Sequence, residues 1–297
     1  MARVAELDFE GFVRRRASGR SGELADDAHA YAYAADRATR ATFERLKPVE
    51  LAVAAGVRAF QHVGRAKLLG NAVRVGPRQF PRVDAIAGSC AKTLGIAPPT
   101  LYVVNSPQLN AGTYGTNQES FMLLNSALID HFSDEELASV VGHECGHIHN
   151  SHVVYLTALH YLTRTASLFV RGLALPAVLA LQAWSRRAEI TSDRAAALCA
   201  GNIETPVRAL AKLALGSKKL YEELDLDEFV TQGADVKGNF GRFGELFDTH
   251  PWLVKRVLAL RAFGESALFR AAAGLGEGGL PMAAVDENVH ELIKVVG

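Results

Sequence analysis

Two histidines and a glutamate lie close enough together in this sequence to form a reaction centre. His143, Glu144 and His147 make the pattern H-E-x-x-H. On a helix, residues four apart share one face, so both imidazoles can bind a single tetrahedral zinc ion. Glu144 lies about 100° around the helix from His143. Its carboxylate can therefore reach a metal-bound water and take its proton.

A third metal ligand is needed, because H-E-x-x-H also occurs by chance on exposed helices. Glu189 lies downstream in a helical stretch, and Asp193 follows it one turn later. We predict that Glu189 is the third ligand. Asp193, on the same face, can hydrogen-bond the outer nitrogen of a bound histidine and fix its tautomer. The alternative is an ordinary charged helix surface, since Arg186 and Arg194 lie nearby.

Three neighbouring residues receive no chemical role. His149 and His152 lie just beyond the motif. If the helix continues, His152 is rotated about 140° from His147, so we interpret both residues as structural or solvated. Cys145 lies nearly opposite His143, and we predict that it is a small buried hydrophobe.

Helix caps, prolines, glycines and apolar runs in the sequence indicate where the surrounding helices and strands lie. Ser133 with Glu136 forms a capping box, which predicts a helix from there to about His152. Pro81 begins a second predicted helix, which ends at Leu94 before a glycine. The runs 101–104 and 121–124 predict short strands. The stretches 155–198, 204–229 and 252–263 predict further helices, 233–244 predicts a glycine-rich loop, and we expect an irregular tail from Ala271.

The composition excludes several classes of protein. Lysine and arginine number 32, as do aspartate and glutamate, so the formal net charge is zero. A nucleic-acid-binding protein usually has a basic surplus, and we expect no nucleic-acid partner. Three scattered cysteines predict no disulfide framework. The N-terminus lacks the apolar stretch of a secretory signal. These features favour a cytoplasmic protein.

One apolar stretch raises the question of a membrane. The uninterrupted part of 168–184 runs from Gly172 to Leu181, whereas a bilayer span needs about 20 residues. Extending it brings in Arg171, which is unfavourable at the bilayer centre. We predict a buried core helix kinked near Pro176. The alternative is a membrane-surface segment over 165–184.

Taken together, these motifs resemble the HtpX-like and CAAX-prenyl-endopeptidase-type gluzincin metallopeptidases over about residues 72 to 262. The matching segments are PTLYVV from Pro99, LNAGTYG from Leu109, the run 121–128, SDEEL from Ser133, VVGHECGHIHNSH from Val140, the E-x-x-x-D of Glu189 and Asp193, and THP from Thr249 with the later Arg256. Membrane-embedded members place two spanning helices between the zinc helix and the glutamate ligand. This chain has room for one marginal apolar stretch there, so it is similar to the compact, non-spanning members.

The resemblance implies a fold and further site residues. The fold would be α+β: a mostly helical, zincin-like protease with a small mixed sheet and an active-site helix. His250 would lie near the zinc and stabilise the oxyanion, although it could also be an ordinary loop residue. Arg256 would pair with a carboxylate, for which Asp193 is a candidate. An edge strand for the substrate would comprise Asn110, Ala111, Gly112, Thr113, Tyr114 and Gly115.

These expectations define one main hypothesis. The protein would be a zinc-dependent endopeptidase with one zinc ion per chain, acting on peptides or unfolded proteins. One alternative is a zinc-stabilised chaperone or scaffold with little proteolytic activity; another is a membrane-surface binding protein that uses 165–184. We expect a helical N-terminal extension over 1–70, a metallopeptidase domain over 71–264 and a C-terminal tail over 265–297. The oligomeric state stays open.

Overall fold

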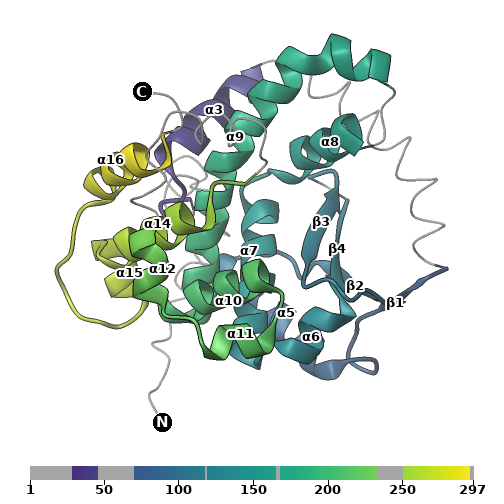
Figure 1. Cartoon of the computed structure of the whole chain (residues 1–297), viewed down its shortest axis with the longest axis horizontal. Coiled ribbons are helices and arrows are strands. Elements are labelled where there is room, and N and C mark those ends of the chain that lie inside the picture. The colour runs from purple at the N-terminus through teal and green to yellow at the C-terminus, as the bar shows by residue number, and fades with distance from the viewer. Residues whose placement is uncertain (1–28, 46–69, 118, 165–167, 233–249, 295–297) are drawn as a thin grey trace, which may run out of the picture.

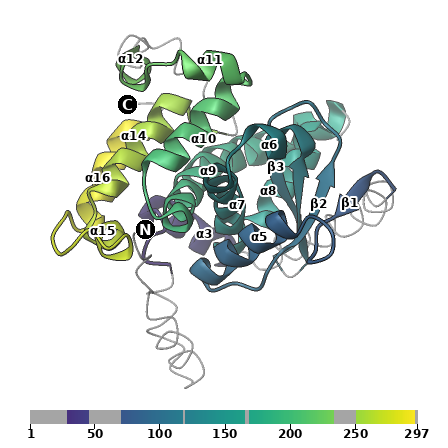
Figure 2. The same ribbon diagram turned by 90° about the horizontal axis from the view of Figure 1, so that it is seen from below.

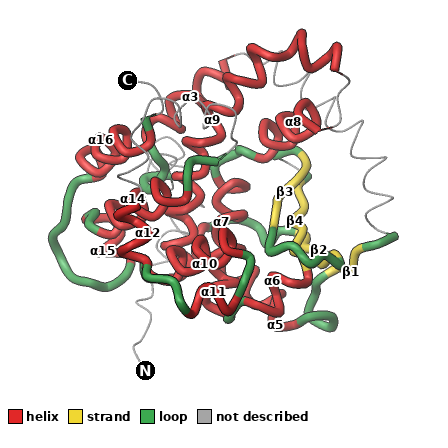
Figure 3. Tube along the Cα trace, in the orientation of Figure 1, coloured by secondary structure: helices red, strands yellow, loops and turns green. Residues whose placement is uncertain are grey.

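The computed structural model describes residues 29–45, 70–117, 119–164, 168–232 and 250–294. Helices dominate it, and a small sheet lies along one side (Figure 1), as the strands in Figure 3 show. The strands are β1 (Ala72–Arg74), β2 (Thr100–Val104), β3 (Ala111–Gly115) and β4 (Ser120–Asn125). The helices are α3 (Ala34–Arg45), α5 (Pro81–Leu94), α6 (Ser126–His131), α7 (Asp134–His149), α8 (Val153–Arg164), α9 (Leu168–Ala200), α10 (Glu204–Leu215), α11 (Lys218–Glu222), α12 (Leu226–Gln232), α14 (Leu253–Gly264), α15 (Ala267–Ala272) and α16 (Met282–Ile293). The α+β prediction is confirmed.

The sheet is mixed and has β3 at one edge. Its strand order is β1-β2-β4-β3. Strands β2 and β4 are parallel, whereas β1 pairs antiparallel with β2 and β3 pairs antiparallel with β4. The predicted strands at 101–104 and 121–124 are confirmed within β2 and β4.

Helix α7 begins as predicted but ends earlier. Ser133 and Glu136 form the full capping box. The helix ends at His149 rather than His152, because Ser151 adopts a left-handed conformation with φ 58°. The Ser151 N–H donates to Ile148 O at 3.1 Å and the His152 N–H donates to His147 O at 2.9 Å. These two bonds form a Schellman motif, which folds His152 back toward the helix.

Two glycines allow α7 to pack directly against α9. A Cβ at Gly142 would lie 2.7 Å from the Cys199 Cβ, and one at Gly146 would lie 2.7 Å from the Ala195 Cβ. Any larger residue would therefore force the two helices apart. This close approach places the residues of α9 beside the histidine-bearing face of α7.

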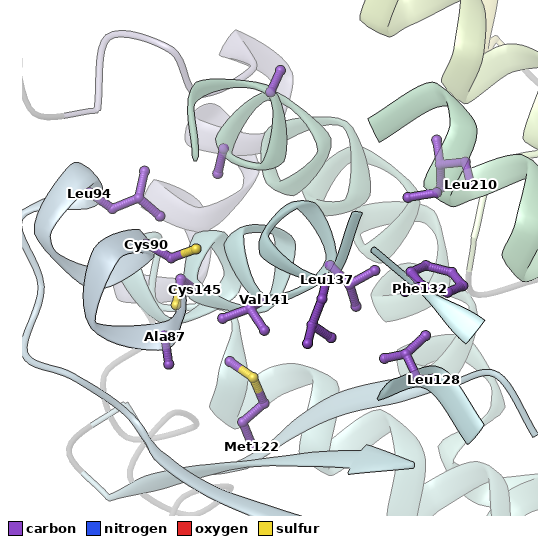
Figure 4. Packing of buried hydrophobic residues seen from close by; sticks show 14 of the residues in the cluster. Ala87, Cys90, Leu94, Met122, Leu128, Phe132, Leu137, Val141, Cys145 and Leu210 are labelled. Atoms are coloured by element: carbon purple, nitrogen blue, oxygen red, sulfur yellow. The ribbon is translucent and has the colours of Figure 1, made fainter. Parts of the chain in front are cut away.

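The core lies between α7, the sheet and α5. Figure 4 shows Met122 of β4 facing Val141 and Cys145 of α7, with Ala87 and Cys90 of α5 close by. Cys145 is fully buried, as predicted. The core therefore holds the far face of α7 in place and leaves its histidine face to the reaction centre.

Segments from both ends of the chain pack on α9 and α14. Helix α3 lies beside α9, and α16 lies beside α14 (Figures 1 and 2). Arg194 of α9 is buried, and its Nη2 lies 2.7 Å from Asp286 Oδ1 of α16. The expectation of an irregular tail from Ala271 is wrong over α16, because Val285 and Val289, four residues apart, bury one helical face.

The apolar stretch is helical, but it is not buried at its proline. Pro176 lies inside α9. Leu175, Pro176 and Ala177 are exposed, and the first of them is 48% accessible. The buried-helix prediction is therefore wrong at these positions, which the described residues leave exposed. Within the described ranges, none of the helices combines the length and the apolar character needed to span a bilayer. Most of 1–70 and the predicted loop at 233–244 fall outside the described residues.

Candidate metal centre

Helices α7 and α9 bring two imidazoles and one carboxylate together. One ligand atom from each of His143, His147 and Glu189 lies within 4.8 Å of the others. The two Nε2 atoms of the histidines are 3.1 Å apart. Glu189 Oε2 is 3.4 Å from His143 Nε2, and Oε1 is 3.4 Å from His147 Nε2. The three predicted ligands therefore converge on one point.

Asp193 and Arg256 support the first imidazole. His143 Nδ1 lies 3.0 Å from Asp193 Oδ1, and it donates this bond because a carboxylate only accepts. Arg256 of α14 makes two hydrogen bonds to Asp193, of 2.8 Å from Nε and 2.6 Å from Nη2. The structure places both residues where the sequence predicts. Because Nδ1 donates to Asp193, Nε2 is the His143 nitrogen that faces the centre.

His152 supports the second imidazole. Its Nδ1 lies 3.1 Å from His147 Nδ1, and its Nε2 lies 3.0 Å from Asp36 Oδ2 of α3. The imidazole is completely buried. Of the two interpretations of His152, structural or solvated, the buried position agrees with the structural one. The expected rotation away from His147 is wrong, because it assumed a helix that continues past His149. A serine, not a glycine, occupies the left-handed position, so the turn has no marker in the sequence.

The electrostatics of the centre favour a cation. Burial alone would raise the pKa of Glu189 and of Asp193, but neighbouring cationic groups, Arg256 among them, lower both below their usual values. Burial would also lower the pKa of His143, yet these two carboxylates raise it to about 10. Glu189 Oε2 is buried without a hydrogen bond, although Arg256 Nη2 lies 3.3 Å away. Nitrogen lone pairs and a buried carboxylate oxygen are the donor set that zinc prefers, so these residues fit the ion.

Glu144 lies beside these residues without joining their cluster. It is 8% accessible and lines the same pocket as His143 and Glu189. The hydroxyl of Thr113 on β3 donates to Glu144 Oε2 at 2.7 Å. This contact holds the carboxylate at the mouth of the pocket. Thr113 was predicted as part of the substrate strand, but nothing in the sequence indicated its bond to the glutamate.

The pocket extends from the polar residues into an apolar region. Its volume is about 380 Å³. The apolar part is formed by α7, α10, α14 and the loop before β3. It is lined by Leu109, Val140, Pro206, Leu210, Leu213 and Leu253. Such a surface suits an apolar side chain rather than a charged one.

Strand β3 presents main-chain groups along the edge that faces away from β4, where no further strand pairs among the described residues. The Asn125 N–H donates to Asn110 O at 3.0 Å, so Asn110 faces β4. The Gly115 N–H instead donates to Thr157 Oγ1 of α8 at 3.0 Å. Because these directions alternate along an antiparallel strand, Ala111 and Thr113 point their backbone groups outward. Of the predicted 110–115 strand, Gly112 and Tyr114 face β4.

His250 completes the predicted set. It lines the pocket, and its Nε2 lies 3.5 Å from Glu189 Oε1. Glu189 raises the pKa of His250, but burial and the nearby Arg256 lower it further, so the net pKa falls below its usual value. The position of His250 is close to the metal ligands, as the sequence predicts.

Comparison with known proteins agrees with this geometry. Residues 77–263 match the family model described as Peptidase family M48. The chain is also similar to the plastoglobule-localized metallopeptidase 48 of Arabidopsis thaliana, with 34% identity over 168 residues, which cover 55% of this chain and 49% of that protein. The match thus spans about half the length of this relative. No solved structure matches the chain.

Proposed function

The chain belongs to peptidase family M48, and we propose that it is a metal-dependent protease, more closely a zinc-dependent endopeptidase. The observation that carries this proposal is the convergence of His143, His147 and Glu189 within 4.8 Å, with Glu144 beside them in one pocket. A zinc ion held by these three residues would polarise the scissile carbonyl and lower the pKa of the attacking water.

Glu144 is the proposed base and acid. Its carboxylate takes a proton from the attacking water and then delivers it to the leaving amine. The Thr113 hydroxyl fixes one oxygen of this carboxylate by donating to Oε2, which leaves Oε1 to meet the water. Because Glu144 is 8% accessible, few bulk waters compete for its proton.

Three further residues that line the pocket receive proposed roles. His250 is the proposed group that stabilises the oxyanion of the tetrahedral intermediate; its position on the pocket wall supports this role. Asp193 and Arg256 are proposed to orient His143 through the hydrogen bonds described above. Outer partners of this kind hold a ligand in one tautomer and raise its basicity.

The substrate is proposed to be an extended segment of polypeptide. The outward backbone groups of Ala111 and Thr113 can accept it as an added strand, which gives affinity with little sequence preference. The neighbouring apolar pocket would take one apolar side chain. A strand edge places no requirement on a free terminus, which favours an endopeptidase. Cytoplasmic location, the absence of a nucleic-acid partner and membrane contact through 165–184 stay predictions.

The test compares Glu144→Gln with the wild-type protein on a peptide library and an unfolded protein, read by mass spectrometry. We expect zinc content to be unchanged and cleavage to fall by about 10²–10⁴-fold, the usual contribution of a positioned base. Glu135→Gln is the matched control, because Glu135 is exposed in the first turn of the same helix. A Glu144→Gln protein that cleaves at the wild-type rate would contradict the mechanism. A zinc-loaded wild type that suppresses aggregation but cleaves nothing would support the chaperone alternative instead.

A further inference from the structure

We propose that His152 and Asp36 form a positioning relay that orients the His147 imidazole toward the metal. Asp36 lies on α3, outside the segment 77–263 that matches the peptidase family. The relay rests on the proposed metal centre, but it does not depend on peptidase activity. It makes a segment near the N-terminus part of the machinery that shapes the metal site.

The hydrogen bonds define one consistent set of tautomers. Asp36 is ionised and can only accept, so His152 Nε2 carries the proton of the 3.0 Å bond. The Nδ1 of a neutral His152 is then an acceptor, and it receives the Nδ1–H of His147 at 3.1 Å. This arrangement leaves the Nε2 lone pair of His147 free to bind a cation. The opposite tautomer of His152 would place two N–H groups against each other.

The carboxylate at the end of the relay is held firmly. Asp36 is 1% accessible. Thr191 Oγ1 donates to its Oδ2 at 2.6 Å, and Trp184 Nε1 donates to its Oδ1 at 2.9 Å. Burial would raise the pKa of Asp36, but the contact with His152 and the hydrogen bonds lower it below its ordinary value. A charge fixed in this way sets the tautomer of His152.

Two local devices place the relay. The Schellman motif at Ser151 turns the chain so that His152 lies against the ring of His147. On the other side, the Tyr33 N–H donates to Thr191 Oγ1 at 3.1 Å, which attaches the start of α3 to α9. The imidazole between them is completely buried. Water therefore has little access to replace either partner.

The experiment measures zinc affinity by competition with a chromophoric chelator, together with the visible absorption spectrum of the Co²⁺-loaded protein. We expect His152→Phe to weaken zinc binding about 10–100-fold, the usual effect of removing an outer partner of a ligand. His152→Asn should recover most of this loss, because its side-chain oxygen can accept from His147 Nδ1. We expect Asp36→Asn to weaken binding about tenfold, since an amide donor facing His152 favours the wrong tautomer.

The order of the variants separates positioning from packing. Phenylalanine fills the histidine's space, whereas asparagine is smaller, so a packing role alone would favour His152→Phe. His149→Phe is the matched control, because His149 follows the same helix and contacts the same N-terminal segment through Tyr31 and His29. Zinc affinity that is equal in His152→Phe and the wild type, or higher in His152→Phe than in His152→Asn, would overturn the relay. A folded wild type that takes up no zinc would overturn the metal centre itself.

Discussion

The two histidines of the metal centre are supported in different ways. His143 contacts a carboxylate directly, and that carboxylate is paired with Arg256 on α14. His147 contacts a second imidazole, and the carboxylate lies one step further away on α3. The residues that support His143 lie within the segment 77–263 that matches the family, whereas the support of His147 includes Asp36, which lies outside it.

The difference shows how two environments can serve the same purpose. Around His143, two carboxylates and an arginine make a charged network in which each member depends on the others. Around His147, the N–H is donated to an imidazole instead of a carboxylate, so the buried carboxylate lies further from the ligand. We therefore expect the first support to be costly to break and the second to act through the tautomer alone.

The largest effect should come from breaking the charged support. In Asp193→Ala, Arg256 loses its closest partner while it is only 12% accessible. Removing one member of a buried pair costs about 3–5 kcal/mol, and we expect this loss in urea unfolding of the metal-free protein. Asp134→Ala is the matched control, because it removes the exposed Arg82–Asp134 pair, worth about 0–1 kcal/mol. Equal losses in the two variants would refute the expectation that the charged support of His143 is costly to break.

An intermediate effect is expected where α7 and α9 touch. Gly146→Ala would place a Cβ 2.7 Å from the Ala195 Cβ and 3.0 Å from the Ser192 Cα. Overpacking of this kind costs about 1–3 kcal/mol. We expect it to weaken zinc binding as well, because separating the helices moves Glu189 and Asp193 of α9 away from the histidines. His152 follows α7 directly, so its contact with His147 should change less.

The control for this change lies on α5. A Cβ at Gly88 meets no atom within 4 Å, so Gly88→Ala should stabilise the protein by about 0.5–1 kcal/mol through helix propensity. Thermal unfolding of the two variants distinguishes these signs. A neutral Gly146→Ala would mean that the helices can separate without loss.

The smallest effect concerns the turn that carries His152. Ser151 has φ 58°, a conformation that costs a residue other than glycine about 1–2 kcal/mol. We expect Ser151→Gly to raise the free energy of unfolding by less than about 1 kcal/mol, because glycine loses more chain entropy. Ser151→Val should lower it by a similar amount. If neither variant changes stability, the turn is not under strain.

Local patterns in the sequence were sufficient for much of the fold and the site. The capping box at Ser133 and the spacing of His143 and His147 act within one helix, so periodicity alone places them correctly. Glu189 and Asp193 follow the same rule on α9. The role of His152 was missed because a serine, rather than a glycine, adopts the left-handed turn. Asp36 could not be found in this way, since its contact spans 116 residues and leaves no periodic trace.

Thr113 belongs to two parts of the proposed reaction at once. Its backbone faces the edge of β3 that lies away from β4, and its hydroxyl holds Glu144 Oε2 at 2.7 Å. A peptide that docks on this edge would contact the same residue that steers the proton acceptor. A shift of β3 on docking would therefore move the Glu144 carboxylate. A peptide that binds in the wrong position would leave this base misaligned with the scissile bond. Under the proposed mechanism, the choice of the cleavage point can thus depend on a single threonine.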